Sequence, residues 1–345
     1  MFTMSDRTER EVHVLLTVAF PPGLQERIEA VSPEIKLHSN PARDVKSIPE
    51  ELLNKAEVLY TIDVLPEPDQ APKLRWVQMH YAGIDHINGS PLLGEDITFT
   101  TMSGASIPQM AEFALMCMLA LGHRLPEVLR SSQAEQWIEG RYTRFQPLEL
   151  RDSTVGIVGY GSIGREIARL CQQFGAHVLA TKHDLMHIED TGYVPEGMGD
   201  PAADIPDRIY PPQALGSMVA LCDFIVVTVP LTPETQGMLD ADVLKAMKPS
   251  AYLVDVSRGG VVDHGALVEA LNGRHLAGAA LDVYPIEPLP ESSPLWKMKN
   301  VILTPHLAGA SPRYLERAAE LFSLNLQRYL TDRPLLNAYD PERGY

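Results

Sequence analysis

The sequence lacks any long uninterrupted apolar run, and this excludes a helical membrane span. No stretch approaches the roughly 18 apolar residues that a bilayer-spanning helix requires. The first residues, MFTMSDRTEREV, also lack the apolar core of a secretory signal. We therefore expect a cytoplasmic protein with no membrane partner.

Cysteine is scarce as well. Cys117, Cys171 and Cys222 are the only three in the chain, and none has a neighbour at CxxC spacing. Each lies in an apolar stretch, where a free cysteine is usually buried, so we expect three reduced thiols in the core. The histidines form no HExxH motif, and the sequence has no Cys/His cluster. It therefore predicts no metal site.

Basic side chains are in deficit. The chain has 29 Lys and Arg against 45 Asp and Glu, which gives a formal net charge of -16. Such a charge repels phosphate backbones, so we expect no nucleic-acid partner. The remaining composition, 45% apolar and 21% charged, is typical of a folded globular protein. At roughly 100 to 200 residues per domain, a chain of 345 residues predicts two domains.

Short apolar runs alternate with helical patterns along most of the chain. One alternation occupies the first 120 residues, and a second, longer one runs from about residue 153 to residue 306. Each alternation predicts βα units and a doubly wound parallel sheet. The apolar stretch 106–125 has too few polar breaks for a surface helix and predicts a buried one.

Only one strong helical pattern, residues 313–330, follows the second alternation, and it is too short for a third domain. We therefore expect a discontinuous domain made of residues 1–120 and 307–345, with residues 121–306 inserted into it as a second domain. Residues 190–212 are rich in Pro, Gly and Asp without a clear period. They predict a surface insertion.

A glycine-rich turn in the inserted domain links an apolar strand to an amphipathic helix, in the sequence GIVGYGSIGREIARL. Gly159 permits a tight turn, Gly161 lets backbone amides approach a pyrophosphate, and Gly164 lets the helix pack closely on the strand. Ser162 and Ile163 open the helix, whose N-terminus favours phosphate. The inserted domain is therefore predicted to bind a dinucleotide.

The residues after the next strand bear on the choice of cofactor. An NAD site usually has an acid about 20 residues beyond the glycines, where it holds the ribose hydroxyls. This chain has Lys182 and His183 there, and cations suit a 2'-phosphate, so we expect NADPH in preference to NADH. The alternative is that Lys182 is solvated and Asp184 holds the ribose.

Three further segments place polar residues after apolar strands: VDVSRGG with Arg258, LDVYPIEP with Asp282 and Glu287, and ILTPHLAG with His306. Hydride transfer to a 2-oxo acid needs a cation for the carboxylate and carbonyl, a proton donor, and a group that orients the donor. Arg258 offers a planar fork, His306 can donate or accept a proton, and Glu287 can orient the imidazole. Taken singly, each has a simpler interpretation: Arg258 as a surface ion pair, Glu287 as a solvated loop acid, and His306 as a hydrogen-bonded histidine at a strand end. Their order behind one fingerprint favours catalysis.

These motifs resemble those of the D-isomer-specific 2-hydroxyacid dehydrogenase family, which includes glyoxylate and hydroxypyruvate reductases. The similarity covers about residues 55–330 and includes YAGIDHI, VPLTPETQGML, LVDVSRGGVVD, GAALDVYPIEPLP and TPHLAGAS. It implies a Rossmann-type cofactor domain inserted into a flavodoxin-like substrate domain. It also implies an NAD(P)-dependent enzyme that interconverts a small 2-oxo acid and a D-2-hydroxy acid, and a homodimer formed through the cofactor domains.

The resemblance assigns roles residue by residue. The family's catalytic arginine, glutamate and histidine fall on Arg258, Glu287 and His306, and Arg258 also binds substrate. The loop whose backbone amides bind the substrate carboxylate falls on Tyr81, Ala82 and Gly83. Together with the fingerprint, the expected cofactor contacts are Gly159, Gly161, Ser162, Ile163, Gly164, Lys182, His183, Val229, Pro230, Ser257, Asp282 and Gly309.

Two positions depart from the family's pattern. Thr228 stands where members often carry His, which leaves the contacts of that loop open, and Lys182 stands where many carry Asp, which favours NADPH. Residues 182–215 also form a longer segment than in typical members. Trp137 resembles a tryptophan that in some relatives reaches the neighbouring subunit's substrate pocket, with a half-buried packing role as an equal alternative.

Other interpretations fit parts of the same pattern. His80 and His86 flank the YAGID motif, and surface or capping roles are favoured over substrate contact. A cofactor-sensing, corepressor-like binding protein of this fold can keep the Arg, Glu and His set, and turnover distinguishes it from an enzyme. Formate dehydrogenase is similar too, but it has Gln where Glu287 stands.

Overall fold

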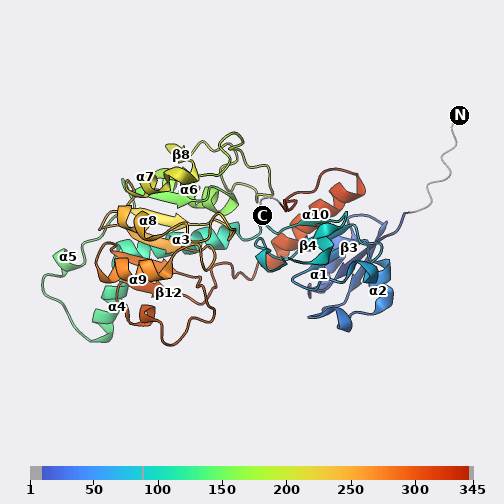
Figure 1. The fold of residues 1–345 in the computed structure, drawn as a ribbon, viewed down its shortest axis with the longest axis horizontal. Helices are drawn as coiled ribbons and strands as arrows, with labels where there is room; N and C mark the ends of the chain where they lie inside the picture. The colour runs from blue at the N-terminus through green and yellow to red at the C-terminus, as the bar shows by residue number, and fades with distance from the viewer. Residues whose placement is uncertain (1–9, 88, 342–345) are drawn as a thin grey trace. The chain divides into compact units, whose positions relative to one another are not determined.

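The computed structural model describes residues 10–87 and 89–341. The chain packs as two units: residues up to 105 and from 311 onward form the first, and residues 106–310 form the second (Figure 1). The second unit is inserted into the first along the chain, at boundaries other than the expected 120 and 306. Among the described residues, no helix is both long and apolar enough to cross a membrane.

A five-stranded parallel sheet forms the centre of the first unit. Its order, β2-β1-β3-β4-β5, is the flavodoxin-like order. The strands are β1 (Val12–Leu16), β2 (Ile35–Ser39), β3 (Val58–Thr61), β4 (Trp76–Met79) and β5 (Thr98–Thr100). The helices are α1 (Pro22–Glu29), α2 (Glu50–Lys55) and α10 (Tyr314–Leu330), with 3-10 turns at Val45–Ser47, Pro68–Gln70, Asp85–Ile87 and Pro91–Gly94.

The central strands of this sheet are covered on both faces. Every residue of β3 and β4 is buried, so neither strand shows the alternation of a half-exposed strand. Helix α10 packs against α1 and contributes Phe322 and Leu326, both fully buried, to the core. The C-terminal helical pattern therefore completes the first unit, as the sequence predicted.

The second unit contains a seven-stranded parallel sheet in the order β12-β11-β10-β9-β6-β7-β8. Counted from β6, this is the dinucleotide-binding order 3-2-1-4-5-6 with one strand added at an edge. The strands are β6 (Thr154–Val158), β7 (His177–Thr181), β8 (Arg208–Tyr210), β9 (Phe224–Val227), β10 (Tyr252–Asp255), β11 (Gly278–Leu281) and β12 (Val301–Leu303). The helices are α3 (Ile107–Gly122), α4 (Leu125–Gln133), α5 (Arg141–Arg144), α6 (Ser162–Gln173), α7 (Leu215–Val219), α8 (Ala241–Ala246) and α9 (His264–Asn272), with 3-10 turns at Pro212–Ala214 and Pro294–Lys297.

Helix α3 is the apolar helix predicted from residues 106–125. It packs against α6, β10 and β11, and its Ala111, Ala114 and Met118 are fully buried. These contacts place α3 in the second unit. The first boundary therefore lies before this helix and not after it.

The segment between β7 and β8 is more ordered than the sequence indicated. Arg165 of α6 is 1% exposed, and its guanidinium donates to two carbonyls of the segment, one of them that of Asp200, and lies 3.6 Å from Oδ2 of Asp190. The Tyr160 hydroxyl donates to Oδ2 of Asp200 at 2.5 Å. The expectation of a surface insertion at 190–212 is therefore wrong for its inner part, which is fastened to the fingerprint helix.

Candidate active site

The glycine-rich turn connects β6 to α6. Gly159 has a φ of +102°, and a Cβ on it would lie 2.7 Å from Cγ1 of Val229. A Cβ on Gly164 would collide with the Gly159 carbonyl oxygen and approach Cγ2 of Ile157 to 2.9 Å. These two positions can carry no side chain without displacing the turn or the helix.

Gly161 differs, because a Cβ there would meet no atom within 4 Å. It is the N-cap residue of α6, and no side chain caps the helix, which begins at Ser162 and Ile163. An uncapped helix N-terminus offers N–H groups and a positive dipole end to an anion. The open space beside Gly161 and this helix end fit the pyrophosphate of a dinucleotide.

The loop after β9 braces this turn. The hydroxyl of Thr228, at the position where the family often has His, donates to the Gly159 carbonyl oxygen at 2.8 Å. Val229 packs against Gly159, and Pro230 follows it. Thr228 thus stabilises the conformation of the glycine-rich turn.

The carbonyl oxygen of Gly309, in the loop after β12, accepts a hydrogen bond from a glutamine side chain of α3 at 2.9 Å.

Lys182 and His183 directly follow β7. The Lys182 amide donates to the Tyr210 carbonyl at 3.0 Å, which ties this residue to β8. The His183 side chain is 62% exposed, and its Nε2 lies 3.6 Å from a carboxylate oxygen of Glu234. Both residues therefore stand at the carboxyl end of β7, where a dinucleotide fold presents the adenosine ribose.

Asp184, the alternative partner for the ribose, is engaged by its own loop. Its Oδ2 lies 2.9 Å from Nδ1 of His187, and its Oδ1 accepts from the amides of Met186 and His187 at 2.9 and 3.2 Å. The hydrogen bond with His187, then that from the Met186 amide, lowers the pKa of Asp184 to about 2. The carboxylate therefore stabilises a turn.

The three residues assigned to catalysis follow neighbouring strands of the second sheet. Arg258 comes after β10, Glu287 after β11 and His306 after β12, and these strands are adjacent. The carboxyl ends of parallel strands meet at one edge, which brings the loops together. Nδ1 of His306 lies 2.9 Å from Oε2 of Glu287, with side chains 47% and 36% exposed. An ionised carboxylate only accepts, so Nδ1 carries the proton of this bond and Nε2 is the nitrogen left to exchange one.

Asp282 organises the loop that carries His306. His306 has a φ of +49°, in the left-handed region that costs a residue with a side chain about 1 to 2 kcal/mol. Oδ1 of Asp282 accepts from the Thr304 hydroxyl at 2.7 Å and the Leu307 amide at 2.9 Å, and Oδ2 accepts from the Ala308 amide at 2.8 Å. This 2% exposed carboxylate thus holds the Thr304 side chain before His306 and two backbone amides after it.

Gly259 is a packing requirement of the candidate site that the motif analysis missed. A Cβ there would collide with the backbone of Tyr284 and lie 2.8 Å from the Pro285 nitrogen. The loop of Arg258 can therefore lie against the next loop only because residue 259 is glycine. The Tyr284 amide in turn donates to Oε1 of Glu287 at 3.0 Å. The signal was present in SRGG, as a glycine directly after the arginine.

Asp255, the last residue of β10, is a second position that the motifs did not reveal. Its Oδ1 accepts from the amide and hydroxyl of Ser257 at 3.0 and 2.6 Å, while its Oδ2 is buried with no hydrogen-bond partner among the described residues. Burial raises the pKa of Asp255 to about 7, although the bonds from Ser257 act to lower it. Nη1 of Arg258 donates to the Ser257 carbonyl at 2.9 Å, so Asp255 supports the start of the arginine loop.

The loop assigned to the substrate carboxylate belongs to the first unit and follows β4. Tyr81 is 46% exposed, Ala82 is exposed and Gly83 is partly exposed. By contrast, His80 is buried at 5% exposure, so it does not have the surface role expected for it. Nε2 of His86 lies 3.1 Å from the carbonyl oxygen of Ile62, the residue after β3, and this is a capping role of the kind expected.

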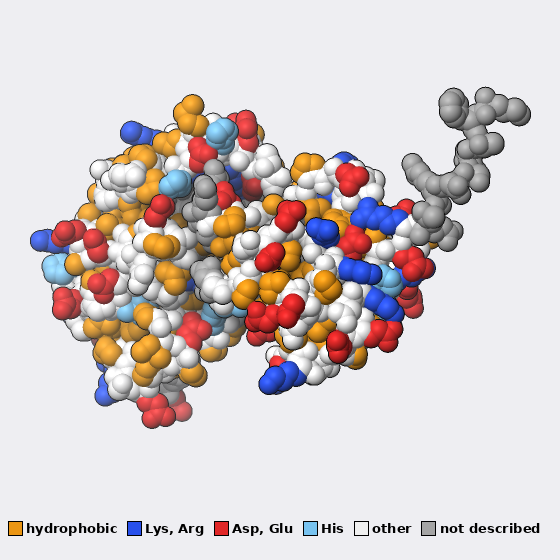
Figure 2. Space-filling view, turned by 45° about the vertical axis from the view of Figure 1, so that its right-hand side comes forward, with side chains coloured by type: hydrophobic (Ala, Val, Ile, Leu, Met, Phe, Trp, Pro, Cys, Tyr) orange, Lys and Arg blue, Asp and Glu red, His pale blue; other side chains and the backbone are white. Residues whose placement is uncertain are grey.

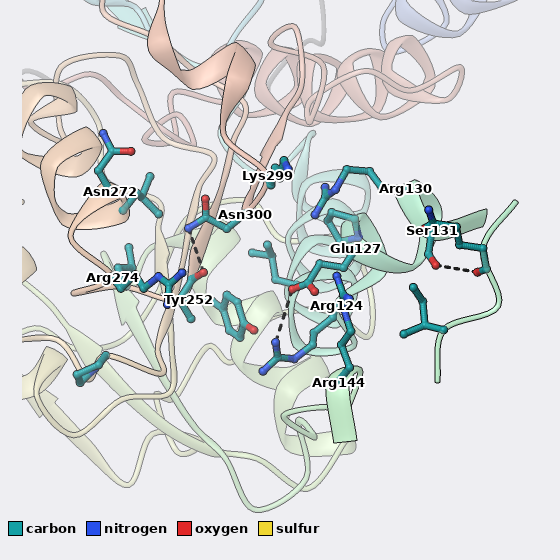
Figure 3. A pocket seen from close by; sticks show the side chains of 18 residues that line it. Arg124, Glu127, Arg130, Ser131, Arg144, Tyr252, Asn272, Arg274, Lys299 and Asn300 are labelled. Carbon is teal, nitrogen blue, oxygen red and sulfur yellow. Dashed lines mark hydrogen bonds and ion pairs between the residues drawn. The ribbon is translucent and has the colours of Figure 1, made fainter. Parts of the chain in front are cut away.

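A cavity of about 750 Å³ lies at the opposite edge of the second sheet (Figure 3). It is bounded by the amino ends of β10, β11 and β12 and by α4. Its charged lining consists of Arg124, Glu127, Arg130, Arg144, Arg274 and Lys299. The residues assigned to cofactor and substrate lie elsewhere, at the carboxyl ends of the strands, where a doubly wound sheet binds its ligands.

Helices α4 and α5 and the loop between them leave large side chains exposed. Trp137 is 84% exposed, Tyr142 82% and Leu129 52%. The Arg141 guanidinium lies 5.2 Å from the Trp137 ring and 4.6 Å from the Tyr142 ring. The alternative of a half-buried packing role for Trp137 is therefore wrong.

The described residues contain no group of three or more His, Cys, Asp or Glu side chains that could hold a metal ion. Cys117, Cys171 and Cys222 are buried and unpaired, as predicted, and burial raises the pKa of each thiol to about 12. Acidic side chains are spread over the visible surface of both units, in keeping with the net charge (Figure 2).

Comparison with known proteins identifies relatives of the chain. Residues 115–308 match the family model described as D-isomer specific 2-hydroxyacid dehydrogenase, NAD binding domain. A glyoxylate reductase of Thermofilum pendens is 35% identical over 260 residues, which are 75% of this chain and 72% of that protein. A D-3-phosphoglycerate dehydrogenase of Mycobacterium tuberculosis is 31% identical over 289 residues, 83% of this chain and 51% of that protein. The chain thus spans about half the length of this mycobacterial relative.

Solved structures are similar over nearly the whole chain. A D-isomer specific 2-hydroxyacid dehydrogenase of Xanthobacter autotrophicus Py2, in complex with NADPH and MES, has a TM-score of 0.79 and 28% identity and covers 97% of this chain and 100% of its own. An NADPH-dependent glyoxylate/hydroxypyruvate reductase of Sinorhizobium meliloti, in complex with citrate, has a TM-score of 0.71 and 27% identity, with coverage of 95% and 98%.

The fold, the ordered motifs and these matches agree. Two parallel-sheet α/β units, the second with a dinucleotide fingerprint, form the arrangement of the matching structures. The family model covers more than half of the chain, and the enzyme class that goes with it is an NAD(P)-dependent oxidoreductase of 2-hydroxy acids. The chain therefore belongs to the D-isomer-specific 2-hydroxyacid dehydrogenase family.

Proposed function

We propose that this protein reduces a small 2-oxo acid, of the glyoxylate or hydroxypyruvate type, to the 2-hydroxy acid with NADPH. Arg258 binds the substrate, His306 exchanges the proton, and Glu287 orients His306. The observation that carries the proposal is the 2.9 Å pair between Nδ1 of His306 and Oε2 of Glu287, at the sheet edge where the Arg258 loop also begins.

In the reduction, the substrate's carbonyl carbon gains a hydride and its oxygen gains a proton. A reduced nicotinamide cofactor, held at the glycine-rich turn, would supply the hydride. Glu287 accepts a hydrogen bond from the Nδ1–H of His306 and stabilises the imidazolium, which donates its Nε2 proton to the developing alkoxide. The Arg258 guanidinium binds the carboxylate and stabilises negative charge on the carbonyl oxygen. In the oxidation, neutral His306 accepts the hydroxyl proton at Nε2.

The preference for NADPH is supported by the charges after β7. Lys182 and His183 stand there, and Asp184 is engaged by His187 and by amides of its own turn. A 2'-phosphate would gain a charge-assisted hydrogen bond from the Lys182 ammonium. The NADPH in the Xanthobacter structure and the NADPH dependence in the name of the Sinorhizobium protein point in the same direction.

A small, unphosphorylated substrate is supported by the loop that follows β4. The stretch YAGIDHINGSPLLGED contains no Lys or Arg, so it offers no basic cluster for a substrate phosphate. The Thermofilum relative is named a glyoxylate reductase. The name of the mycobacterial relative points to a phosphorylated substrate, but that protein is about twice as long as the matched region.

The active form is a homodimer assembled through the second unit. Trp137 and Tyr142 expose rings that this unit leaves uncovered, and the arginine-rich cavity beside α4 complements a chain with a net charge of -16. Light scattering on the purified protein should give twice the chain mass of 38.1 kDa. The double substitution Trp137→Ser with Tyr142→Ser should give the single mass. A parent protein of 38.1 kDa would refute the dimer.

A substrate panel tests the enzymatic proposal. The purified protein is given glyoxylate, hydroxypyruvate, pyruvate and phosphohydroxypyruvate, each with NADPH and with NADH, and formate is tested with the oxidised cofactors. We expect the highest kcat/KM for glyoxylate or hydroxypyruvate with NADPH. Oxidation of formate would establish the formate dehydrogenase alternative. Cofactor binding without turnover of any compound would establish the cofactor-sensing alternative.

A further inference from the structure

His80 lies in an aromatic cluster directly before the substrate loop. Its side chain is buried, and its ring centroid lies 5.6 Å from that of Tyr60, 4.8 Å from that of Tyr81 and 5.2 Å from that of Tyr314. Nδ1 of His80 is 2.7 Å from the Tyr60 hydroxyl. The amide of His80 continues the ladder from β4 by donating to the Thr61 carbonyl at 2.7 Å.

Two further hydrogen bonds fix the peptide units on either side of Tyr81. The Tyr314 hydroxyl, in the first turn of α10, donates to the His80 carbonyl oxygen. The Met102 amide donates to the Tyr81 carbonyl oxygen at 3.2 Å. A peptide unit is planar, with its C=O and N–H pointing in opposite directions. A bond to the His80 carbonyl therefore sets the direction of the Tyr81 N–H, and a bond to the Tyr81 carbonyl sets that of the Ala82 N–H.

We propose that Tyr314 is a positioning residue for substrate recognition, because its hydroxyl aims the Tyr81 amide N–H at the substrate carboxylate. This inference rests on the proposed function, in which the amides of residues 81–83 bind that carboxylate. Tyr314 itself does not touch the substrate. It acts through one peptide plane, and the ring of His80, held by Tyr60, keeps that plane in place.

The chemistry of the cluster suits a fixed support. Burial lowers the pKa of His80 to about 4, so its ring stays neutral across the pH range in which a cytoplasmic enzyme works. The groups that contact this ring are the phenols of Tyr60, Tyr81 and Tyr314, and burial raises the pKa of Tyr60 and Tyr314 further. The two buried phenols, Tyr60 and Tyr314, therefore stay neutral near neutral pH, so the support of this peptide plane does not change its charge.

The test removes the hydroxyl alone. Tyr314→Phe should raise KM for the best 2-oxo acid of the panel about 3- to 10-fold, which is the effect of one neutral hydrogen bond. The inhibition constant of oxalate, a dicarboxylate that cannot be reduced, should rise by the same factor. The kcat value and the KM for the cofactor should stay within about twofold of the parent's. Tyr60→Phe, which frees the ring of His80, should shift the same two constants in the same direction by a smaller factor.

The matched control is Tyr329→Phe. Tyr329 lies on the same helix, and its hydroxyl donates to Oε1 of Glu57 at 2.6 Å, away from the substrate loop. It should lower the melting temperature as Tyr314→Phe does and leave KM and the oxalate constant unchanged. Equal constants for Tyr314→Phe and the parent, or equal shifts in Tyr314→Phe and the control, would overturn the inference. A parent that reduces no 2-oxo acid would instead overturn the proposed function.

Discussion

In the proposed function, the single-residue feature that matters most for substrate binding is the planar fork of the Arg258 guanidinium. Arg258→Lys keeps the charge and loses the two parallel donors, so kcat/KM for the 2-oxo acid should fall by about one to two orders of magnitude, the range for a lost hydrogen bond to a charged group. Steady-state kinetics with saturating cofactor measures this. Arg27→Lys, on the exposed face of α1 in the first unit, is the control and should behave like the parent. Parental kinetics in Arg258→Lys would show that charge alone suffices.

In the proposed function, cofactor choice is also decided by a single residue, Lys182. Lys182→Asp replaces a cation with an acid where the ribose is expected, so the ratio of kcat/KM for NADPH to that for NADH should fall by about one to two orders of magnitude. Lys245→Asp, an identical charge change on the exposed face of α8, should leave the ratio unchanged. Equal ratios in Lys182→Asp and the parent would place the 2'-phosphate contact elsewhere.

The sequence could predict the site residues that lie within a recognisable motif. Arg258, Glu287 and His306 could be placed together because each follows an apolar strand of one parallel sheet. The roles of Asp255, Gly259 and Tyr314 could not, because they depend on contacts between loops or on the orientation of one peptide plane. No spacing rule connects Gly259 to the backbone of Tyr284 or the Tyr314 hydroxyl to a carbonyl 234 residues earlier.

At the scale of elements, the loops after β10 and β11 pack so closely that residue 259 has no room for a side chain. Gly259→Ala would push its Cβ into the Tyr284 backbone and separate the Arg258 loop from the Glu287 loop. We expect kcat/KM to fall at least tenfold and unfolding free energy to fall by about 1 to 3 kcal/mol, as for an overpacked core. Gly216→Ala is the control, because a Cβ there, in α7, would meet nothing within 4 Å. A fully active Gly259→Ala would mean that the loops can separate without consequence.

We expect Asp255, at the end of β10, to make stability depend on pH. Asp255 has an ordinary pKa of 3.8, and burial raises it to about 7 in the folded protein. Between these values the folded state binds a proton that the unfolded state does not, so this residue's contribution to stability falls as the pH rises through that range. Asp255→Asn removes the titrating group. The difference in urea midpoint, variant minus parent, should therefore be larger at about pH 8 than at about pH 5.

The control for this pH dependence is Glu291→Gln, which neutralises an exposed acid on the same unit. Its urea midpoint should follow the parent's at both pH values. A difference between Asp255→Asn and the parent that is the same at both pH values would show that Asp255 does not titrate in this range.

Elements with strong periodicity were predicted well, and short edge elements were not. The apolar runs of β1, β3, β4, β6, β7 and β9 to β12 were recognised, as were α3 and α10. The sequence analysis missed β2, with the half-polar sequence IKLHS, and β5 and β8, which have three residues each. Pairing with an existing sheet stabilises such strands, and their own propensity contributes little. The segment before β8 is likewise ordered by the distant Arg165.

At the scale of the whole molecule, the architecture followed from the alternation of strands and helices. Both sheets are parallel, and their orders are the two common doubly wound ones. The chain passes from the first unit to the second after residue 105, which is 15 residues before the predicted boundary at 120. It returns to the first unit after residue 310, four residues after the predicted boundary at 306. The first boundary was misplaced because α3 packs on α6, a contact that the order of residues along the chain does not show.

The central claim is that His306, paired with Glu287, exchanges the proton. Its most direct test is kcat/KM of His306→Ala for glyoxylate or the best substrate of the panel, with cofactor affinity measured by fluorescence on the same sample. His177→Ala is the control, because Nδ1 of His177 lies 3.1 Å from Asp207 in another exposed histidine–carboxylate pair of the same unit. We predict a loss of about two to four orders of magnitude in His306→Ala, with cofactor affinity within about twofold and a control equal to the parent. A folded His306→Ala that turns over like the parent would contradict the account.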